Sequence, residues 1–233
     1  MRIAILSDIH SNLPALSKAL SIIGHIGVDE LYCLGDIVGY GAMANECVDL
    51  IRTHATRCVV GNHDLAAIDP SQSNLLPKPG RLAALWTNKI LSRENTAYLS
   101  SLPFRIETKS VTLVHANPAR PEEWAYVGTL DDAVPQFAHF RTPLCFIGHT
   151  HIPFVCGEDL KTFYLRKGIR SLVNVGSIGQ PRDGNPQLSF GILDTDAWSF
   201  EAIRADYDIE TAAQAIIKNG LPDILANRLF RGI

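Results

Sequence analysis

The first 36 residues predict a strand, a helix and a second strand, which together form a βαβ unit. Residues 2–7 are mostly apolar, residues 13–24 carry apolar side chains at helical spacing, and residues 31–34 are apolar again. Because such a unit brings its two strands side by side and parallel, Asp8 and Asp36, which follow them, should lie at one sheet edge. Two carboxylates held that close repel, and one would take up a proton unless a cation lay between them.

Three further predicted strands also end in polar residues that can bind a metal. Arg57–Val60 runs into Gly-Asn62-His63-Asp64, Val111–Val114 into His115, and Leu144–Ile147 into Gly-His149-Thr-His151. In extended chain, residues two apart face one side, so Asp8 can meet His10 and His149 can meet His151. Each motif alone has an ordinary structural explanation, because Asp, Asn and Gly favour turns and a single histidine at a strand end is usually structural. Their recurrence at successive strand ends is the stronger observation.

Composition narrows the class of protein. The chain has 233 residues, 46% hydrophobic and 19% charged, which is consistent with one domain over residues 1–233. A formal net charge of -3 gives no reason to expect binding to nucleic acid or to an anionic membrane. No apolar segment approaches the ~20 residues of a membrane span. Five widely spaced cysteines without a CxxC pair indicate neither disulfides nor a thiolate zinc site, so we expect a cytoplasmic protein.

The order of the remaining elements suggests the layers of the fold. Turn-forming residues predict a loop over residues 65–80, either a lid or substrate-selecting segment or a plain connector. Helices are expected at 81–92, 94–99 and 131–140, strands at 154–156, 162–165, 172–175, 190–193 and 198–200, and two helices within 208–233. Helices alternate with strands early and strands cluster late. The chain should therefore form an α/β fold, a four-layer α/β/β/α sandwich of two mixed sheets flanked by helices.

In order, the motifs Asp-x-His, Gly-Asp, Gly-Asn-His-Asp, Val-His and Gly-His-x-His resemble those of the calcineurin-like metallophosphoesterase family, in particular its compact bacterial and archaeal phosphoesterases. The resemblance covers residues 8–151 directly. It implies two divalent metal ions, manganese or iron in preference to zinc, nickel or cobalt. One would be bound by Asp8, His10, Asp36 and His151, and the other by Asp36, Asn62, His115 and His149, with Asp36 bridging.

The resemblance also implies a reaction, hydrolysis of phosphodiesters or small phosphomonoesters. The nucleophile would be a metal-bridging hydroxide attacking in line, since a metal can lower the pKa of bound water to about 7. His63 would protonate the leaving oxygen, with Asp64 holding its ring, and Asn62 and His63 would contact the substrate. Such proton transfer contributes about 10² to 10⁴-fold.

One departure from related phosphatases bears on the substrate. Protein phosphatases of the superfamily resemble Gly-Asp-x-Val-Asp-Arg-Gly at the second motif, whereas this chain has Gly-Asp36-Ile-Val-Gly-Tyr40-Gly. A phosphoprotein phosphatase is therefore an alternative of lower rank, and so is a non-catalytic metal-holding scaffold. A nuclease is disfavoured because acidic residues outnumber basic ones, whereas binding along a phosphate backbone requires a basic groove. Arg182 could face a phosphate, although an exposed turn arginine is the simpler interpretation. The sequence does not define the oligomeric state.

Overall fold

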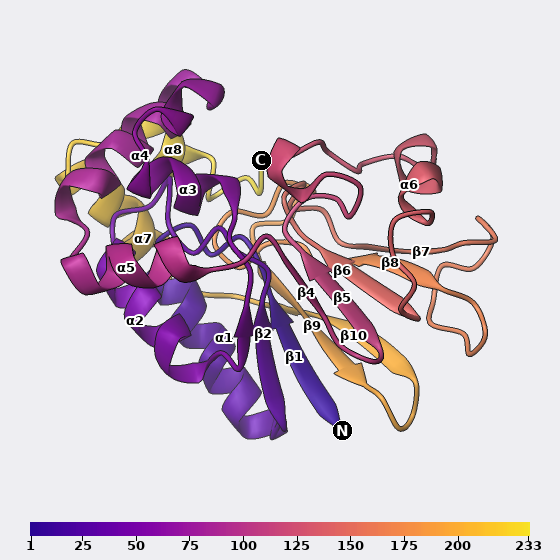
Figure 1. Ribbon diagram of the computed structural model, residues 1–233. Coiled ribbons are helices and arrows are strands. Elements are labelled where there is room, and N and C mark those ends of the chain that lie inside the picture. The colour runs from indigo at the N-terminus through magenta and orange to yellow at the C-terminus, as the bar shows by residue number, and fades with distance from the viewer.

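Two five-stranded mixed sheets face one another in the computed structural model, which describes residues 1–233 (Figure 1). The first sheet has the order β10-β9-β1-β2-β3 and the second the order β4-β5-β6-β8-β7. The strands of the first sheet are β1 (Arg2–Leu6), β2 (Glu30–Cys33), β3 (Arg57–Cys58), β9 (Leu188–Asp194) and β10 (Ser199–Ala205). Those of the second are β4 (Arg105–Glu107), β5 (Val111–Val114), β6 (Leu144–Ile147), β7 (Phe154–Gly157) and β8 (Ser171–Asn174).

Each sheet contains three adjacent parallel strands and two strands that run antiparallel to their neighbours. β1 pairs in parallel with β2, and β2 with β3, while β9 runs antiparallel to β1. β5, β6 and β8 are likewise parallel, with antiparallel β4 and β7 at the edges. The predicted βαβ start and the mixed sheets are confirmed, and β9 and β10 form an antiparallel hairpin.

Alternating side chains of the strands build separate cores. On β1, Ile3 and Ile5 point into the core between the sheets, whereas Ala4 and Leu6 pack under the helices. On β6, Phe146 enters the same central core, where residues of both sheets meet. This period of two follows from the pleat of a strand.

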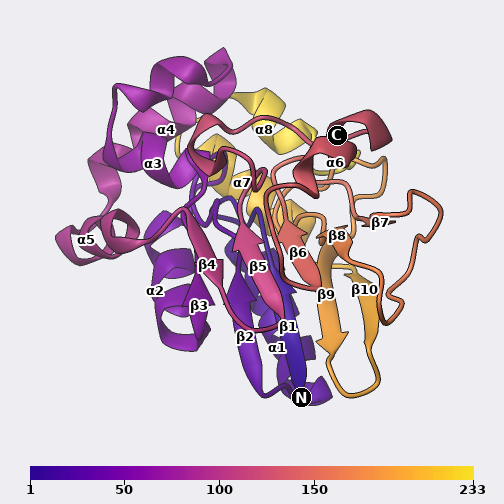
Figure 2. The same ribbon diagram turned by 45° about the vertical axis from the view of Figure 1, so that its right-hand side comes forward.

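Helices cover the two outer faces unequally. Figures 1 and 2 show α1 (Leu13–Ile26) and α2 (Ala44–His54) against the first sheet, with α3 (Asn62–Ile68), α4 (Lys78–Ile90), α5 (Arg93–Ser101) and α7 (Ile209–Lys218) grouped above them. The outer face of the second sheet packs under α6 (Leu130–Gln136) and the chain that follows it. The fourth layer of the sandwich is therefore one short helix. α8 (Asp223–Asn227) joins α7 and Tyr40 in a further small core. None of the helices combines the length and apolar character needed to cross a bilayer.

Two local predictions were wrong. Residues 65–80 are not a loop, because α3 covers 62–68, a 3₁₀ turn covers Gln72–Leu75 and α4 begins at Lys78. Asp64, the third residue of α3, accepts the backbone N–H of Gly61 at 3.1 Å and so caps a helix whose first residues resemble a turn.

The predicted strand at 162–165 is also absent, because Asp159 accepts the N–H groups of Lys161 and Thr162 and bends the chain.

Candidate metal centre

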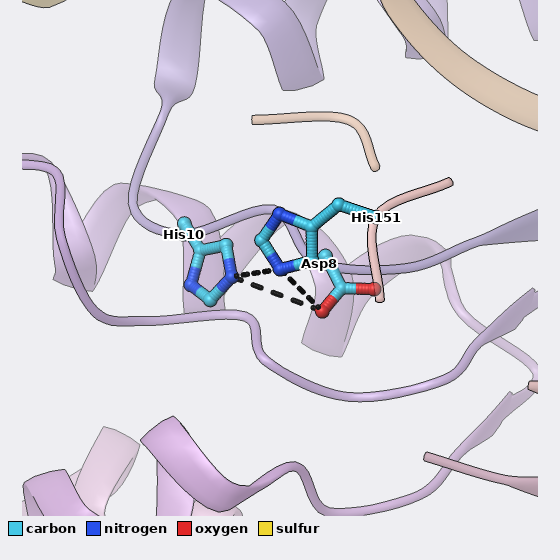
Figure 3. A group of neighbouring side chains, drawn as sticks. All are labelled: Asp8, His10 and His151. Carbon is cyan, nitrogen blue, oxygen red and sulfur yellow. Dashed lines mark hydrogen bonds and ion pairs between the residues drawn. The ribbon is translucent and has the colours of Figure 1, made fainter. Parts of the chain in front are cut away.

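The first cluster of possible metal ligands consists of Asp8, His10 and His151, which come from the loops after β1 and β6 (Figure 3). The Nε2 atoms of His10 and His151 lie 3.1 Å apart. Oδ1 of Asp8 lies 3.2 Å from Nε2 of His151 and 3.8 Å from Nε2 of His10. All three residues are buried, so the donors converge in a place shielded from bulk water.

The second cluster consists of Asp36, His115 and His149, from the loops after β2, β5 and β6. Nε2 of His115 lies 3.2 Å from Nδ1 of His149 and 3.4 Å from Oδ2 of Asp36. Asn62, at the start of α3, places its Oδ1 3.2 Å from Nε2 of His115 and so belongs to this cluster.

The two clusters meet at the carboxylates. Oδ2 of Asp36 is 3.6 Å from Nε2 of His10, and Oδ1 of Asp8 is 3.9 Å from Nε2 of His115. In each carboxylate the other oxygen already accepts hydrogen bonds. Oδ2 of Asp8 accepts from the hydroxyl of Ser7 and from the main-chain N–H of His149. Oδ1 of Asp36 accepts from the main-chain N–H of His63. Oδ1 of Asp8 is buried without any hydrogen-bond partner. Each carboxylate thus directs one oxygen at the histidines.

The ring nitrogens show that these residues fit a cation. Nδ1 of His10, His115 and His151 contacts the main-chain oxygen of Val38, Leu34 and Gln180, respectively. Because a carbonyl oxygen can only accept, each Nδ1 carries the hydrogen, and the Nε2 atom of the neutral ring presents a lone pair. Two such lone pairs facing each other at 3.1 Å, as in the first cluster, repel unless an electrophile lies between them.

Charge within the site is consistent with this arrangement. Burial lowers the pKa of His10 and His151 below the ordinary range, and lowers that of His149 to about 3, so these rings are neutral at pH 7. Burial also tends to lower the pKa of His115, but Asp36 and Asp8 outweigh it and raise the value to about 10. The proton on His115 thus balances carboxylate charge that a cation would otherwise balance.

Backbone conformation at the site is unusual. Five candidate ligands have positive φ: Asp8, His10, Asp36, His149 and His151, at 53°, 51°, 51°, 65° and 63°. Non-glycine residues rarely adopt this left-handed region, and such strain often accompanies functional sites. Asp8 and His10 converge as expected, although not through extended chain, whereas the expectation that His149 and His151 face one side was wrong. Tight turns direct them instead, and His149 and His151 enter different clusters.

His63 is buried beside both clusters, and its ring lines a cavity. The ring packs against Tyr40, with centroids 4.3 Å apart, and edge-on against His10 at 5.0 Å. Asp64 does not hold this ring, contrary to expectation, because its oxygens accept the N–H groups of Val38 and Gly61. Burial lowers the pKa of His63 to about 4, and burial followed by repulsion from Asp36 raises that of Asp64 to about 7.

The cavity has a volume of about 520 Å³ and opens directly onto the candidate ligands. Asp36, Asn62, His149 and His151 form part of its wall. Residues 72–80 form another part, so the segment expected to be either a lid or a connector does border the site. Arg182 lines the cavity too, and the simpler interpretation of it as an exposed turn residue was wrong.

Sequence reasoning missed residues that surround the ligands. Tyr40 contacts His10 and His63, and Arg228 reaches the cavity from the end of α8. The only local signal for Tyr40 is its place between two glycines, and none marks Arg228. Trp124 and Tyr126 also line the cavity, and the ring of Tyr126 stacks on His149.

Known proteins share this sequence and fold. A family model for the calcineurin-like phosphoesterase superfamily domain matches residues 1–197. An uncharacterized protein of Methanocaldococcus jannaschii, MJ0912, is 44% identical over 240 residues, covering 99% of this chain and 98% of that protein. The phosphodiesterase YfcE of Escherichia coli K12 is 26% identical over 214 residues, covering 87% and 92%. The crystal structure of a metallophosphoesterase from Sphaerobacter thermophilus superposes with a TM-score of 0.89 at 38% identity, covering 100% of this chain and 99% of the other.

Proposed function

Because the chain belongs to the calcineurin-like phosphoesterase superfamily, we propose that it hydrolyses phosphodiesters or small phosphomonoesters at a centre of two divalent metal ions. One observation carries the proposal: two carboxylate oxygens and two pairs of facing imidazole nitrogens converge beside one cavity. The similarity to a phosphodiesterase, YfcE, supports a diester as one substrate class.

The first ion would be held by Asp8, His10 and His151, and the second by His115, His149 and Asn62, with Asp36 contributing to both. Bound divalent ions would lower the pKa of a water molecule to about 7 and stabilise the charge of the phosphoryl group. Two carboxylates leave an excess of about two positive charges, which suits an anionic substrate. Nitrogen and oxygen donors without thiolate are compatible with manganese or iron, which we favour, and with zinc, nickel or cobalt.

His63 is the proposed general acid. Its ring borders the cavity and packs against Tyr40, and its main-chain N–H donates to Oδ1 of Asp36, so the residue is held beside the point where the donors converge. With a pKa of about 4 the ring is neutral at pH 7, and an incoming phosphoryl anion would favour its protonated form. Asp64 is a positioning residue in this scheme, since it holds the turns that carry Val38 and Gly61.

Hydrolysis of bis(p-nitrophenyl) phosphate by protein reconstituted with manganese, iron, cobalt, nickel or zinc tests the proposal. We expect activity that depends on added metal and that falls about 10² to 10⁴-fold in His63→Gln and His63→Ala. Metal content, measured by elemental analysis, should remain that of the unaltered protein. The matched control is His54→Ala, an exposed histidine on α2.

Two results would contradict the assignment. Full activity in the His63 variants would show that His63 is not the general acid. Protein that is inactive with every metal would favour a metal-holding scaffold of the same fold.

We also propose that residues 1–233 form one domain. The central core takes residues from both sheets, and each ligand cluster combines loops of both. Limited proteolysis should therefore release no fragment that retains metal.

A further inference from the structure

Two arginines from the C-terminal part of the chain line the cavity, and no step of the proposed reaction uses them. Arg182 follows β8 and Arg228 follows α8. Their guanidinium carbons lie 5.7 and 5.8 Å from the centre of the Tyr40 ring. Two segments that are 46 residues apart in the sequence thus bring two positive charges to one aromatic ring beside the metal centre.

Neither arginine is neutralised by an acidic side chain. Arg182 donates to Oε1 of Gln180 at 2.9 Å and to the hydroxyl of Tyr40 at 3.3 Å, and its Nε is buried without a partner. Arg228 has no Asp or Glu partner either, and donates from Nε to the α-carboxyl group of Ile233, the last residue of the sequence. By contrast, two other partly buried arginines each pair with a carboxylate: Arg170, just before β8, with Glu158, and Arg204, on β10, with Asp183. The cavity therefore holds two guanidinium groups without an Asp or Glu partner.

The two arginines also repel each other. Burial lowers the pKa of Arg228 below its ordinary value, and the nearby charge of Arg182 lowers it further. An anion bound between them would relieve both effects.

Tyr40 fixes where this pair lies relative to the reaction. Its ring packs against His63 and His10, at centroid distances of 4.3 and 4.6 Å, and the arginines contact the same ring. The aromatic residues Trp124 and Tyr126 lie instead by His115 and His149, at 5.9 and 4.2 Å. The cavity thus has a cationic side next to His63 and an aromatic side next to the second cluster.

We propose that Arg182 and Arg228 bind a second anionic phosphoryl group of the substrate, carried by the part that leaves toward His63. The inference rests on the proposed function, because it takes His63 to mark the leaving-group side. A planar guanidinium group donates two parallel hydrogen bonds to phosphate and keeps its charge at any physiological pH. The substrate class narrows to small phosphoesters that carry two phosphoryl groups, of which one is cleaved.

Three synthetic ligands, which differ by one phosphate, test this. The first is two thymidines joined by a single phosphodiester. The second and third are the same molecule with an added 5′-phosphate and with an added 3′-phosphate. Inhibition constants are measured against hydrolysis of bis(p-nitrophenyl) phosphate, and dissociation constants by calorimetry on the metal-loaded protein. One terminal phosphate should tighten binding about tenfold or more, since hydrogen bonds between charged groups contribute about 1.5 to 3 kcal/mol. That gain should vanish in Arg182→Gln and in Arg228→Gln.

The controls separate charge, hydrogen-bond geometry and folding. Arg231→Gln removes an exposed arginine three residues from Arg228 and should keep the gain. Arg182→Lys keeps the charge but loses the fork of donors, so it should retain part of the gain. Thermal unfolding of each variant shows whether it is folded at the assay temperature.

Several outcomes overturn the inference. It fails if neither terminal phosphate tightens binding to the unaltered protein, or if the gain survives in both glutamine variants. It also fails if the variants weaken all three ligands equally, because the arginines would then bind the cleaved phosphate. If bis(p-nitrophenyl) phosphate is not hydrolysed with any metal, the proposed function fails, and the calorimetric comparison still decides whether the arginines bind a terminal phosphate.

Discussion

Each ligand cluster contains one aspartate and two histidines, but the histidines of the two clusters are supported differently. In the first, His10 and His151 each hold a main-chain carbonyl through Nδ1 and direct Nε2 inward, and their exposed fractions are 1% and 2%. In the second, His149 directs Nδ1 inward, forms no hydrogen bond through Nε2 and is 6% exposed at the cavity wall. The stacked ring of Tyr126, 4.2 Å away, takes the place of the hydrogen bond.

This difference indicates a rigid site next to a more labile one. A hydrogen bond to the far nitrogen fixes the tautomer and orientation of a ligating histidine, and losing such a contact typically costs about 10 to 100-fold in metal affinity. Stacking restrains the plane of the ring but selects no tautomer. We therefore expect the first cluster to bind its ion more tightly than the second.

The largest effect should come from Asp36→Asn, which removes the charge that both clusters share. Oδ2 of Asp36 lies within 3.6 Å of ring nitrogens in each cluster, so both ions should weaken and activity should fall by about 10³-fold. Metal content and turnover of bis(p-nitrophenyl) phosphate measure this, with Asp49→Asn, an exposed change on α2, as control. Two tightly held ions in Asp36→Asn would show that the clusters are independent.

Next in size are two glycine substitutions that each disturb one carboxylate. A Cβ at Gly148 would lie 2.4 Å from Oδ2 of Asp8, and a Cβ at Gly61 would lie 2.1 Å from Oδ1 of Asp36. Because displacing a catalytic group by about 1 Å can cost 10²-fold, both variants should lose about that much activity. Gly148→Ala should lose the ion of the first cluster, whereas Gly61→Ala should weaken both.

The control for this pair is Gly24→Ala on α1, where a Cβ would meet nothing within 4 Å. The thermal unfolding temperature of each variant distinguishes a displaced carboxylate, which leaves the fold stable, from a destabilised fold. If Gly148→Ala retains the tighter ion, the ranking of the two clusters is wrong.

A smaller effect distinguishes the clusters directly. Titration of the two-metal protein with a chelator should remove the ions in two steps whose affinities differ by about 10-fold or more, as expected for one missing hydrogen bond to a ligating histidine. In His149→Ala only the tighter step should remain, and in His151→Ala only the weaker one. A single step in the unaltered protein would show that the different supports do not affect affinity.

Much of this comparison was accessible from the sequence because the ligands follow buried strands. Apolar runs located β1, β2, β5 and β6, and the polar residue after each lies at the site. The partition of His149 and His151 between clusters came from the family resemblance, because their spacing alone favoured a common side. The left-handed turns that separate them are set by contacts such as the N–H of His149 with Asp8, across 141 residues.

The residues that sequence reasoning missed depend on tertiary structure. Arg228 reaches Tyr40 only because α8 and α4 pack around that ring, and no pattern near either residue encodes this contact. The family resemblance placed Asp64 against the ring of His63, yet the first turn of a helix turns the carboxylate back to Gly61. Local patterns thus located the donors but not what holds them.

The smallest effect tests whether stacking supports the second cluster. Tyr126→Ala removes the ring beside His149, and since an aromatic pair contributes about 0.5 to 1.5 kcal/mol, the weaker ion should lose about 2 to 10-fold in affinity. Tyr126→Phe keeps the ring and should retain normal affinity, and the tighter ion should be unaffected in both. Tyr126 is largely exposed, so unfolding temperatures should change little and the calorimetric metal titration reports the stacking alone. If Tyr126→Ala binds both ions normally, the ring does not support His149, and the second cluster would differ from the first only in its missing hydrogen bond.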